Sequence, residues 1–349
     1  MAAAAAGEPT RSTSRHLQKG TVESLRPPGV CLHAWIQICL GLLVRMTGFP
    51  SAMWRASHRP AALHTLATAC EVVGVGLHSG EMARVRLLPS SEHGITFQRS
   101  DQRRAPPVVA RPGAVVSTVL STTLGLAGGA TIATVEHLLA ALCGLRVESC
   151  RVEVDAAELP VLDGSAAPWV SAIQRAGLKP LHEASSPVVV REPLWVEESG
   201  SWVAAVPAPS PRLTVGIEFE HAPIGRQWAS WTPEPATREQ RGEGDGAASF
   251  VSEVAPARTF ALHEQIPALR EAGLIRGGSL DNALVCDTVR WLNGPLRFAN
   301  EPARHKLLDL LGDLALLGGR LPQAHIVAFR ASHKLHVRLA AAIEAACTP

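Results

Sequence analysis

Hydrophobic and polar positions recur with different periods along the chain, and these periods predict a mixture of helices and strands. The pattern predicts helices in five segments, at 134–145, 166–176, 267–272, 302–318 and 333–346. Alternating or continuous apolar runs predict strands at 64–76, 81–88, 147–154, 283–286 and 323–329, and a hairpin within 188–206. Because each half of the chain mixes strands with two longer helices, the sequence predicts an α+β fold twice over.

The first 62 residues differ in composition from the rest. Basic residues far outnumber acidic ones here, and serine and alanine are frequent, which is typical of an organelle transit peptide. The apolar run 30–44 is shorter than the ~20 residues that a membrane-spanning helix needs, and His33 and Gln37 interrupt it. We therefore expect a cleaved or disordered presequence over residues 1–62 rather than a membrane anchor, and no integral membrane span.

Beyond the presequence, the pattern predicts two domains, 63–182 and 187–346. The polar stretch 182–187 ends in proline and is expected to be the linker between them. Residues 232–247 are rich in proline, glycine and charge and offer no core positions, so we expect a solvated loop there.

Composition narrows the class of protein. The 349 residues are 46% hydrophobic and 18% charged, as in folded globular proteins. A net charge of +2 gives no reason to expect a nucleic-acid partner. The seven cysteines include no Cys-x-x-Cys pair, so a cysteine zinc site is not supported. Gly74-Val-Gly76 resembles the start of a dinucleotide loop, but a strand rather than a helix is predicted after it, which favours a glycine-rich hairpin.

The leucine-rich helix at 302–318 carries the first candidate chemistry. His305 and Asp309 are four residues apart, so their Cβ atoms lie about 5–6 Å apart on one face, a spacing that suits two ligands of one metal ion. Asp313 extends the same stripe by one turn. Because the helix is apolar nearly all round, these polar side chains need buried partners. Taken alone, such a pair is more often a structural hydrogen bond or an exposed ion pair than a metal site.

Glu136 and His137 lie in the first turn of the helix at 134–145. If His137 is a third ligand, Glu136 points about 100° away around the helix axis, near the metal without binding it, where a general base is needed. The alternative is an exposed acid beside a half-buried histidine. His333 lies at a strand-to-helix junction and is a further catalytic candidate, with His325 and His336 as alternatives. His263-Glu264 lacks a second histidine four residues on and is expected to be surface.

Six ordered blocks within about 64–345 then resemble a known family, the UDP-3-O-acyl-N-acetylglucosamine deacetylases, zinc enzymes that commit carbohydrate to lipid A synthesis. The matching blocks are Gly74–His78, Thr134–His137, Leu159–Pro168, Ala257–Phe260, Gly277–Asp281 and Arg304–Asp313. The resemblance implies two α+β domains, each a β-sheet layered with two α-helices, whose helix layers face each other across the active site. It also implies one Zn²⁺ per chain, held by His137, His305 and Asp309 with an open fourth position for water.

The resemblance further implies hydrolysis of the 2-N-acetyl group with release of acetate. Glu136 would be the base, and the hydroxyl of Thr259 would face the oxyanion. His333, oriented by Asp313, would be the acid. Among the substrate-binding residues, Lys306 and Arg330 would neutralise the UDP diphosphate. Phe260 and the insert at about 261–294 would line a passage for the acyl chain, and Leu120 and Ser121 would frame the site.

The chain departs from the family pattern in three places. Ser332 stands where glycine is usual, Arg330 stands where bacterial members have lysine, and the loop 232–247 is longer than usual. The presequence, absent from bacterial members, suggests a plant or algal protein sent to mitochondria, with plastids as the alternative. We expect a monomer whose partner is the nucleotide-sugar lipid substrate. Two other functions stay open: a catalytically idle homologue that binds nucleotide-sugar or lipid, and a zinc amidase for another acylated amino sugar.

Overall fold

A seven-stranded mixed sheet makes up the framework of residues 62–184. The computed structural model describes residues 62–347 apart from 103, 127–128, 185–186 and 234–245. The sheet has the order β10-β1-β9-β3-β2, and β4 pairs with β9 and β5. Its strands are β1 (Ala62–Leu66), β2 (Cys70–Val75), β3 (Met82–Pro89), β4 (Gly94–Arg99), β5 (Val108–Val109), β9 (Ser149–Val154) and β10 (Leu178–Ala184).

The predicted strand at 64–76 is two strands. The backbone leaves the sheet after Leu66 because the N–H groups of Ala67 and Thr68 donate to the carbonyls of Gly177 and Ala176, at 2.9 and 3.1 Å. The chain resumes at Cys70, which pairs with Leu87 in an antiparallel hairpin of β2 and β3. Alternate residues of β3 are buried, as expected for a strand with one face on a core. The hairpin confirms the prediction that Gly74-Val-Gly76 opens no dinucleotide-binding helix.

Two helices cover this sheet, α2 (Glu136–Gly144) and α3 (Ala167–Ala176). Both lie within two residues of their predicted bounds. A three-stranded sheet precedes α2 and consists of β6 (Val115–Ser117), β7 (Thr123–Gly125) and β8 (Thr131–Ile132), with the short helix η3 (Pro112–Ala114) before it. Nothing in the alternation of these short strands predicted them, because strands of two or three residues show no measurable period.

A five-stranded sheet dominates the second half of the chain, in the order β11-β12-β17-β13-β14. Its strands are β11 (Leu194–Glu198), β12 (Ser201–Pro207), β13 (Arg212–Glu218), β14 (Arg226–Trp231) and β17 (Ala324–Phe329). The predicted hairpin is formed by β11 and β12, turning through Ser199 and Gly200, both at positive φ. Helices α6 (Glu301–Leu314) and α7 (His333–Cys347) pack on one face of this sheet.

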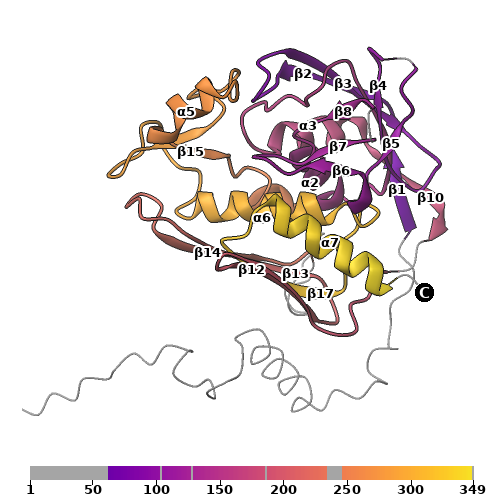
Figure 1. Cartoon of the computed structure of the whole chain (residues 1–349). Coiled ribbons are helices and arrows are strands. Elements are labelled where there is room, and N and C mark those ends of the chain that lie inside the picture. Colours follow the sequence, from indigo (N-terminus) through magenta and orange to yellow (C-terminus); the bar gives the residue numbers. More distant parts are fainter. Residues whose placement is uncertain (1–61, 103, 127–128, 185–186, 234–245, 348–349) are drawn as a thin grey trace, which may run out of the picture. The chain divides into compact units, whose positions relative to one another are not determined.

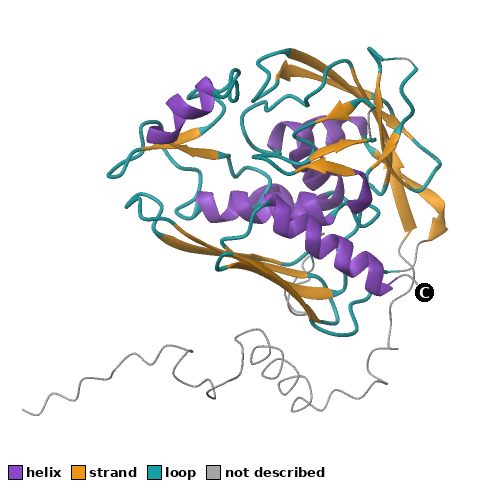
Figure 2. Cartoon of the chain, in the orientation of Figure 1, coloured by secondary structure: helices purple, strands orange, loops and turns teal. Residues whose placement is uncertain are grey.

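Helix packing joins the two halves of the described chain. Helix α2 packs against α6, α6 against α7, and α2 against α3. Figure 2 shows these helices between the two main sheets, and Figure 1 shows α6 and α7 lying above the sheet of β12, β13, β14 and β17. The fold is therefore α+β with α2, α3, α6 and α7 gathered between the two main sheets, which confirms the predicted fold class.

The segment between β14 and α6 adds small elements. They are α4 (Gly246–Glu253), β15 (Phe260–Leu262), η5 (His263–Gln265), α5 (Ile266–Glu271) and β16 (Leu284–Cys286). Strands β15 and β16 pair in parallel, separate from both main sheets. The predicted helix at 267–272 and the strand at 283–286 are confirmed, and His263 and Glu264 are exposed, as expected.

Some predicted boundaries differ from the structure. Helix α6 ends at Leu314 rather than 318, because the chain then turns through Gly318 and Gly319, both at φ +79°. Strand β10 runs to Ala184 and so occupies the start of the stretch expected as linker. The predicted presequence and most of the loop 232–247 lie outside the described residues.

The described residues contain neither a disulfide nor a helix that could span a membrane. All five cysteines in that part of the chain are free, at positions 70, 143, 150, 286 and 347. None of the helices in the described ranges combines the length and the hydropathy that a membrane span requires.

Candidate active site

The close crossing of α2 and α6 places the candidate residues together. Gly312 of α6 lies against the backbone of Glu136, where a Cβ atom would come within 2.1 Å of the Glu136 carbonyl oxygen. Only glycine allows this approach. Thr134, at φ +59°, turns the chain just before α2, and its hydroxyl donates to Glu158 at 3.0 Å. These contacts fix the start of α2 beside the middle of α6.

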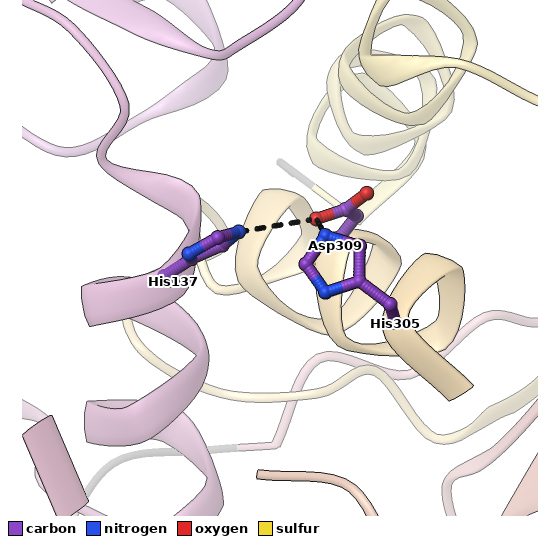
Figure 3. A group of neighbouring side chains, drawn as sticks. All are labelled: His137, His305 and Asp309. Atoms are coloured by element: carbon purple, nitrogen blue, oxygen red, sulfur yellow. Dashed lines mark ion pairs between the residues drawn. The ribbon is translucent and has the colours of Figure 1, made fainter. Parts of the chain in front are cut away.

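Three side chains, here termed the donor cluster, meet at the crossing: His137 of α2 and His305 and Asp309 of α6 (Figure 3). The Oδ1 atom of Asp309 lies 3.4 Å from His305 Nε2 and 3.7 Å from His137 Nε2. The two imidazole rings are almost perpendicular, at 88°, with centroids 5.1 Å apart. All three side chains are buried. The distances from Asp309 to the two histidines are longer than a typical hydrogen bond. Two ring nitrogens and one carboxylate oxygen nevertheless point towards one another.

The polar contacts around the donor cluster orient it for a metal ion. Nδ1 of His305 donates to the carbonyl of Ala257 at 3.1 Å, which leaves the Nε2 lone pair facing the cluster. Lys306 Nζ donates to Asp309 Oδ2 at 2.8 Å, which leaves Oδ1 facing the two histidines. Two nitrogens and a carboxylate oxygen within 4.8 Å of one another are a donor set that fits a divalent metal such as zinc.

The protonation states in the donor cluster also fit metal binding. Burial lowers the pKa of His305 to about 4, so its imidazole is neutral at neutral pH. Burial alone would raise the pKa of Asp309, but the charges of Lys306 and His305 hold it well below its usual value. A neutral imidazole and an ionised carboxylate are the forms that bind a metal.

A second group, here termed the acid–base cluster, surrounds Asp313, which lies one turn further along α6. Its other members are Glu136 of α2 and His333 and His336 of α7. Asp313 Oδ2 accepts hydrogen bonds from Nδ1 of His333 at 2.8 Å and from Nδ1 of His336 at 2.9 Å. Nε2 of His333 lies 3.9 Å from Oε1 of Glu136. All four side chains are buried. His333 therefore has Asp313 on one ring nitrogen and faces Glu136 with the other.

Burial and neighbouring charges together shift the pKa values of this cluster. Burial raises the pKa of Glu136, which makes it a better base. Burial alone would lower the pKa of His333, but the charge of Asp313, its hydrogen bond and the charge of Glu136 raise it to about 9. His333 is therefore protonated at neutral pH and can donate a proton. Burial lowers the pKa of His336, whose hydrogen bond to Asp313 opposes the shift.

The two candidate phosphate partners differ in their surroundings. Lys306 is bound to Asp309, and its Nζ lies 5.9 Å from the centroid of the Phe260 ring. Arg330 is exposed, at φ +53° just after β17, with Nη1 3.9 Å from Glu218. Phe260 is half-buried at the start of β15 and packs edge-on against Phe219, with centroids 5.6 Å apart.

The remaining predicted site residues have fewer recorded contacts. Thr259 is half-buried, and its backbone N–H donates to Gly164 while its carbonyl accepts from Leu284, both at 2.8 Å. Leu120, at φ +60°, is 51% exposed between β6 and β7, whereas Ser121 is buried. Among the described residues, the structure records no hydrogen bond from the Thr259 hydroxyl to either cluster.

Comparison with known proteins places the chain in a family. The sequence pattern of the family described as UDP-3-O-acyl N-acetylglycosamine deacetylase (LpxC) matches residues 63–345. The chain belongs to the LpxC family.

Named relatives agree with this family. A protein of Trichormus variabilis named UDP-3-O-acyl-N-acetylglucosamine deacetylase is 50% identical over 280 residues, covering 79% of this chain and 96% of that protein. A Synechocystis protein of the same name is 48% identical over 280 residues, with the same coverage. An Arabidopsis thaliana protein named "Probable UDP-3-O-acyl-N-acetylglucosamine deacetylase 1, mitochondrial" is 40% identical over 297 residues, covering 79% of this chain and 86% of that protein.

Sequence reasoning missed several contacts in this LpxC-family site. It did not single out Thr122, whose polar atoms reach both Glu136 and Asp313, nor the Ala257 carbonyl that orients His305. A threonine between two very short strands gives no periodic signal. Gly312 could have been found, because an isolated glycine within a leucine-rich helix often marks a close packing contact.

Proposed function

We propose that this chain is a zinc-dependent deacetylase that hydrolyses the 2-N-acetyl group of UDP-3-O-(3-hydroxyacyl)-N-acetylglucosamine and releases acetate. One observation carries the proposal: a buried carboxylate, Glu136, lies 3.9 Å from a buried histidine of raised pKa, His333, next to three convergent donor atoms. The names of the relatives supply the substrate, and the step would be the committed one of lipid A synthesis.

One Zn²⁺ would be held by His137, His305 and Asp309. When bound there, it would supply Lewis-acid chemistry, polarising the amide carbonyl and lowering the pKa of a coordinated water from 15.7 towards ~7. The neutral His305 and the ionised Asp309 support this assignment, and so does the Ala257 carbonyl that fixes the ring of His305.

Proton movement would fall to the acid–base cluster. Glu136 would take a proton from the water as its oxygen adds to the acetyl carbonyl carbon. The bond between that carbon and the sugar nitrogen then breaks, and His333 would give its proton to the leaving nitrogen. Acetate and the free amine result. The bond from His333 to Asp313 supports this role, because it fixes the ring with Nε2 towards Glu136.

The carbonyl oxygen gains negative charge during the addition and needs donors. We assign the Thr259 hydroxyl to this oxygen, a role that typically contributes ~10²–10³ in turnover. Its backbone is held by Gly164 and Leu284 just before β15, which supports a fixed position for the side chain.

The substrate's diphosphate and acyl chain would be bound by the surrounding residues. An ammonium group has three N–H donors, so Lys306 can bind a phosphate oxygen while it contacts Asp309. The exposed Arg330 would be the second phosphate partner. Phe260, with the insert 261–294, would contact the acyl chain, and Leu120 and Ser121 would frame the opposite side.

We propose a mitochondrial location and a monomeric enzyme with domains at 63–182 and 187–346. The basic composition of residues 1–62 supports import, and the similar Arabidopsis proteins are named mitochondrial. A fluorescent fusion of residues 1–62 should enter mitochondria. Import into plastids instead would overturn this location without touching the enzymatic proposal.

The function is tested by incubating the full chain with UDP-3-O-acyl-N-acetylglucosamine and measuring acetate and free amine together with bound zinc. Equal amounts of acetate and amine, and one zinc per chain, are expected. Zinc-loaded protein that releases neither product would overturn the proposal. The control is the variant His325→Ala, because His325 lies on β17, outside the site. This variant should retain zinc and turnover.

A further inference from the structure

Thr122 links the two halves of the described chain at the acid–base cluster. It lies just before β7, on the first half, and is fully buried. Its partner Asp313 lies on α6, in the second half, 191 residues further along the chain. Contacts between side chains so far apart in sequence are formed only when the whole fold is assembled.

Each polar group of Thr122 that faces the cluster binds a different carboxylate. The backbone N–H donates to Oε2 of Glu136 at 3.0 Å. The hydroxyl donates to Oδ1 of Asp313 at 2.5 Å. Hydrogen bonds to ionised carboxylates are among the stronger ones in proteins, and those from a hydroxyl donor are typically short.

The two contacts with Thr122 leave the other oxygen of each carboxylate facing His333. Oε1 of Glu136 lies 3.9 Å from His333 Nε2, while its Oε2 is held by Thr122. Oδ2 of Asp313 accepts from His333 Nδ1, while its Oδ1 is held by Thr122. Rotation of either carboxylate would break its bond to Thr122 and change the position of His333.

The loop that carries Thr122 is itself fixed. The Thr122 carbonyl accepts from the N–H of Val135 at 3.3 Å, immediately before α2. Thr123 begins β7 and pairs with Ser117 of β6. Thr122 is therefore anchored to the same helix that carries Glu136.

We propose that Thr122 is a positioning residue that holds the base Glu136 and, through Asp313, the acid His333 in a fixed mutual geometry. This inference rests on the proposed deacetylase function. Thr122 touches no reacting atom in this account and acts through the two carboxylates. Its hydroxyl is the part that a substitution can remove without disturbing the backbone contact to Glu136.

The test compares Thr122→Val, which keeps the shape and the N–H but lacks the hydroxyl, with Thr122→Ser, which keeps the hydroxyl. For Thr122→Val we expect kcat to fall by up to ~10²-fold, the cost of a misplacement of about 1 Å, with KM and bound zinc unchanged. Thr122→Ser should recover most of the turnover. Thr214→Val, which removes a threonine hydroxyl from the outer face of β13, is the matched control and should behave as wild type.

A second measurement needs no turnover. In ¹⁵N-histidine-labelled protein, the Nδ1–H resonance of His333, assigned by its loss in His333→Gln, should shift or broaden in Thr122→Val and stay in place in Thr122→Ser. An inactive wild type would refute the proposed function, and this resonance would still test Thr122. Wild-type kcat and an unchanged His333 resonance in Thr122→Val would overturn the positioning role.

Discussion

The donor cluster and the acid–base cluster lie one helical turn apart on α6, yet their polar atoms are held differently. The nearest approaches among His137, His305 and Asp309 are 3.4 and 3.7 Å, with no strong hydrogen bond between them. In the acid–base cluster, Asp313 accepts bonds of 2.8 and 2.9 Å from His333 and His336. The first arrangement leaves lone pairs converging, as a metal requires, and the second leaves protons in defined places.

The difference explains how one buried helix can serve two purposes. The donor cluster is oriented from outside, by the Ala257 carbonyl on His305 and by Lys306 on Asp309. The acid–base cluster is oriented from inside, by bonds among its own members and from Thr122. Substitutions in the two clusters should therefore separate metal binding from turnover.

The largest effect is expected for His305→Ala. Substituting a residue that only orients a metal ligand typically lowers the metal affinity by about 10–100-fold. Loss of a ligand itself should therefore weaken zinc binding by at least ~10²-fold and abolish turnover at ordinary zinc levels. Zinc content after gel filtration and acetate release measure the two effects. His325→Ala is the matched control. A His305→Ala variant that keeps stoichiometric zinc would show that the donor cluster is not the metal site.

The next largest effect is expected for His333→Gln. Glutamine can still hydrogen-bond to Asp313 but cannot supply a proton, so kcat should fall by ~10²–10⁴-fold while zinc content stays at the wild-type level. Single-turnover acetate release measures the chemical step. If kcat stays within a few-fold of wild type, His333 is not the acid, and His336 becomes the candidate.

The pH profile of kcat should decline on the alkaline side because of His333. Its pKa is raised to about 9, so the protonated form that donates is present below that pH and is lost as the pH rises through it. We expect kcat to be level around neutral pH and to fall above about 9. The variant His333→Gln should lose this alkaline decline. A decline centred near pH 6.5, the ordinary histidine value, would contradict the raised pKa.

The smallest effect on turnover is expected for His336→Phe. His336 donates to Asp313 at 2.9 Å, and the contacts described for it include none with Glu136, so its loss should affect stability more than chemistry. Bonds to charged groups contribute about 1.5–3 kcal/mol, and the free energy of unfolding should fall by that amount in urea denaturation. His325→Phe is the control. A drop in kcat as large as that of His333→Gln would make His336 part of the chemistry.

The sequence predicted more of the donor cluster than of its surroundings. The i, i+4 spacing of His305 and Asp309 follows from helical geometry alone, and the helices other than α4 and most longer strands follow from apolar periodicity. The pairing of His137 with them could not be derived that way, because it depends on a helix crossing between residues that are far apart in sequence. The family resemblance supplied it.

Other features of the site and the fold were not predicted from the sequence. Lys306 was expected to bind only the phosphate of the substrate, and Asp309 only the metal. In the structure the two side chains, three residues apart on α6, form a salt bridge with each other. Thr122 gave no signal because two- and three-residue strands have no measurable period. The longer strands β13 and β14 were also missed, because the buried Gly216 interrupts the alternation of β13 and β14 begins with the polar residues Arg226 and Gln227.

The division of labour between the two clusters is tested most directly by Glu136→Gln, with zinc content and acetate release measured on the same sample. We predict one zinc per chain, as in wild type, and a kcat lower by ~10²–10⁴-fold, because glutamine keeps the shape of Glu136 but cannot accept the proton. Loss of zinc together with activity, as expected for His305→Ala, would contradict it. So would full zinc with wild-type turnover.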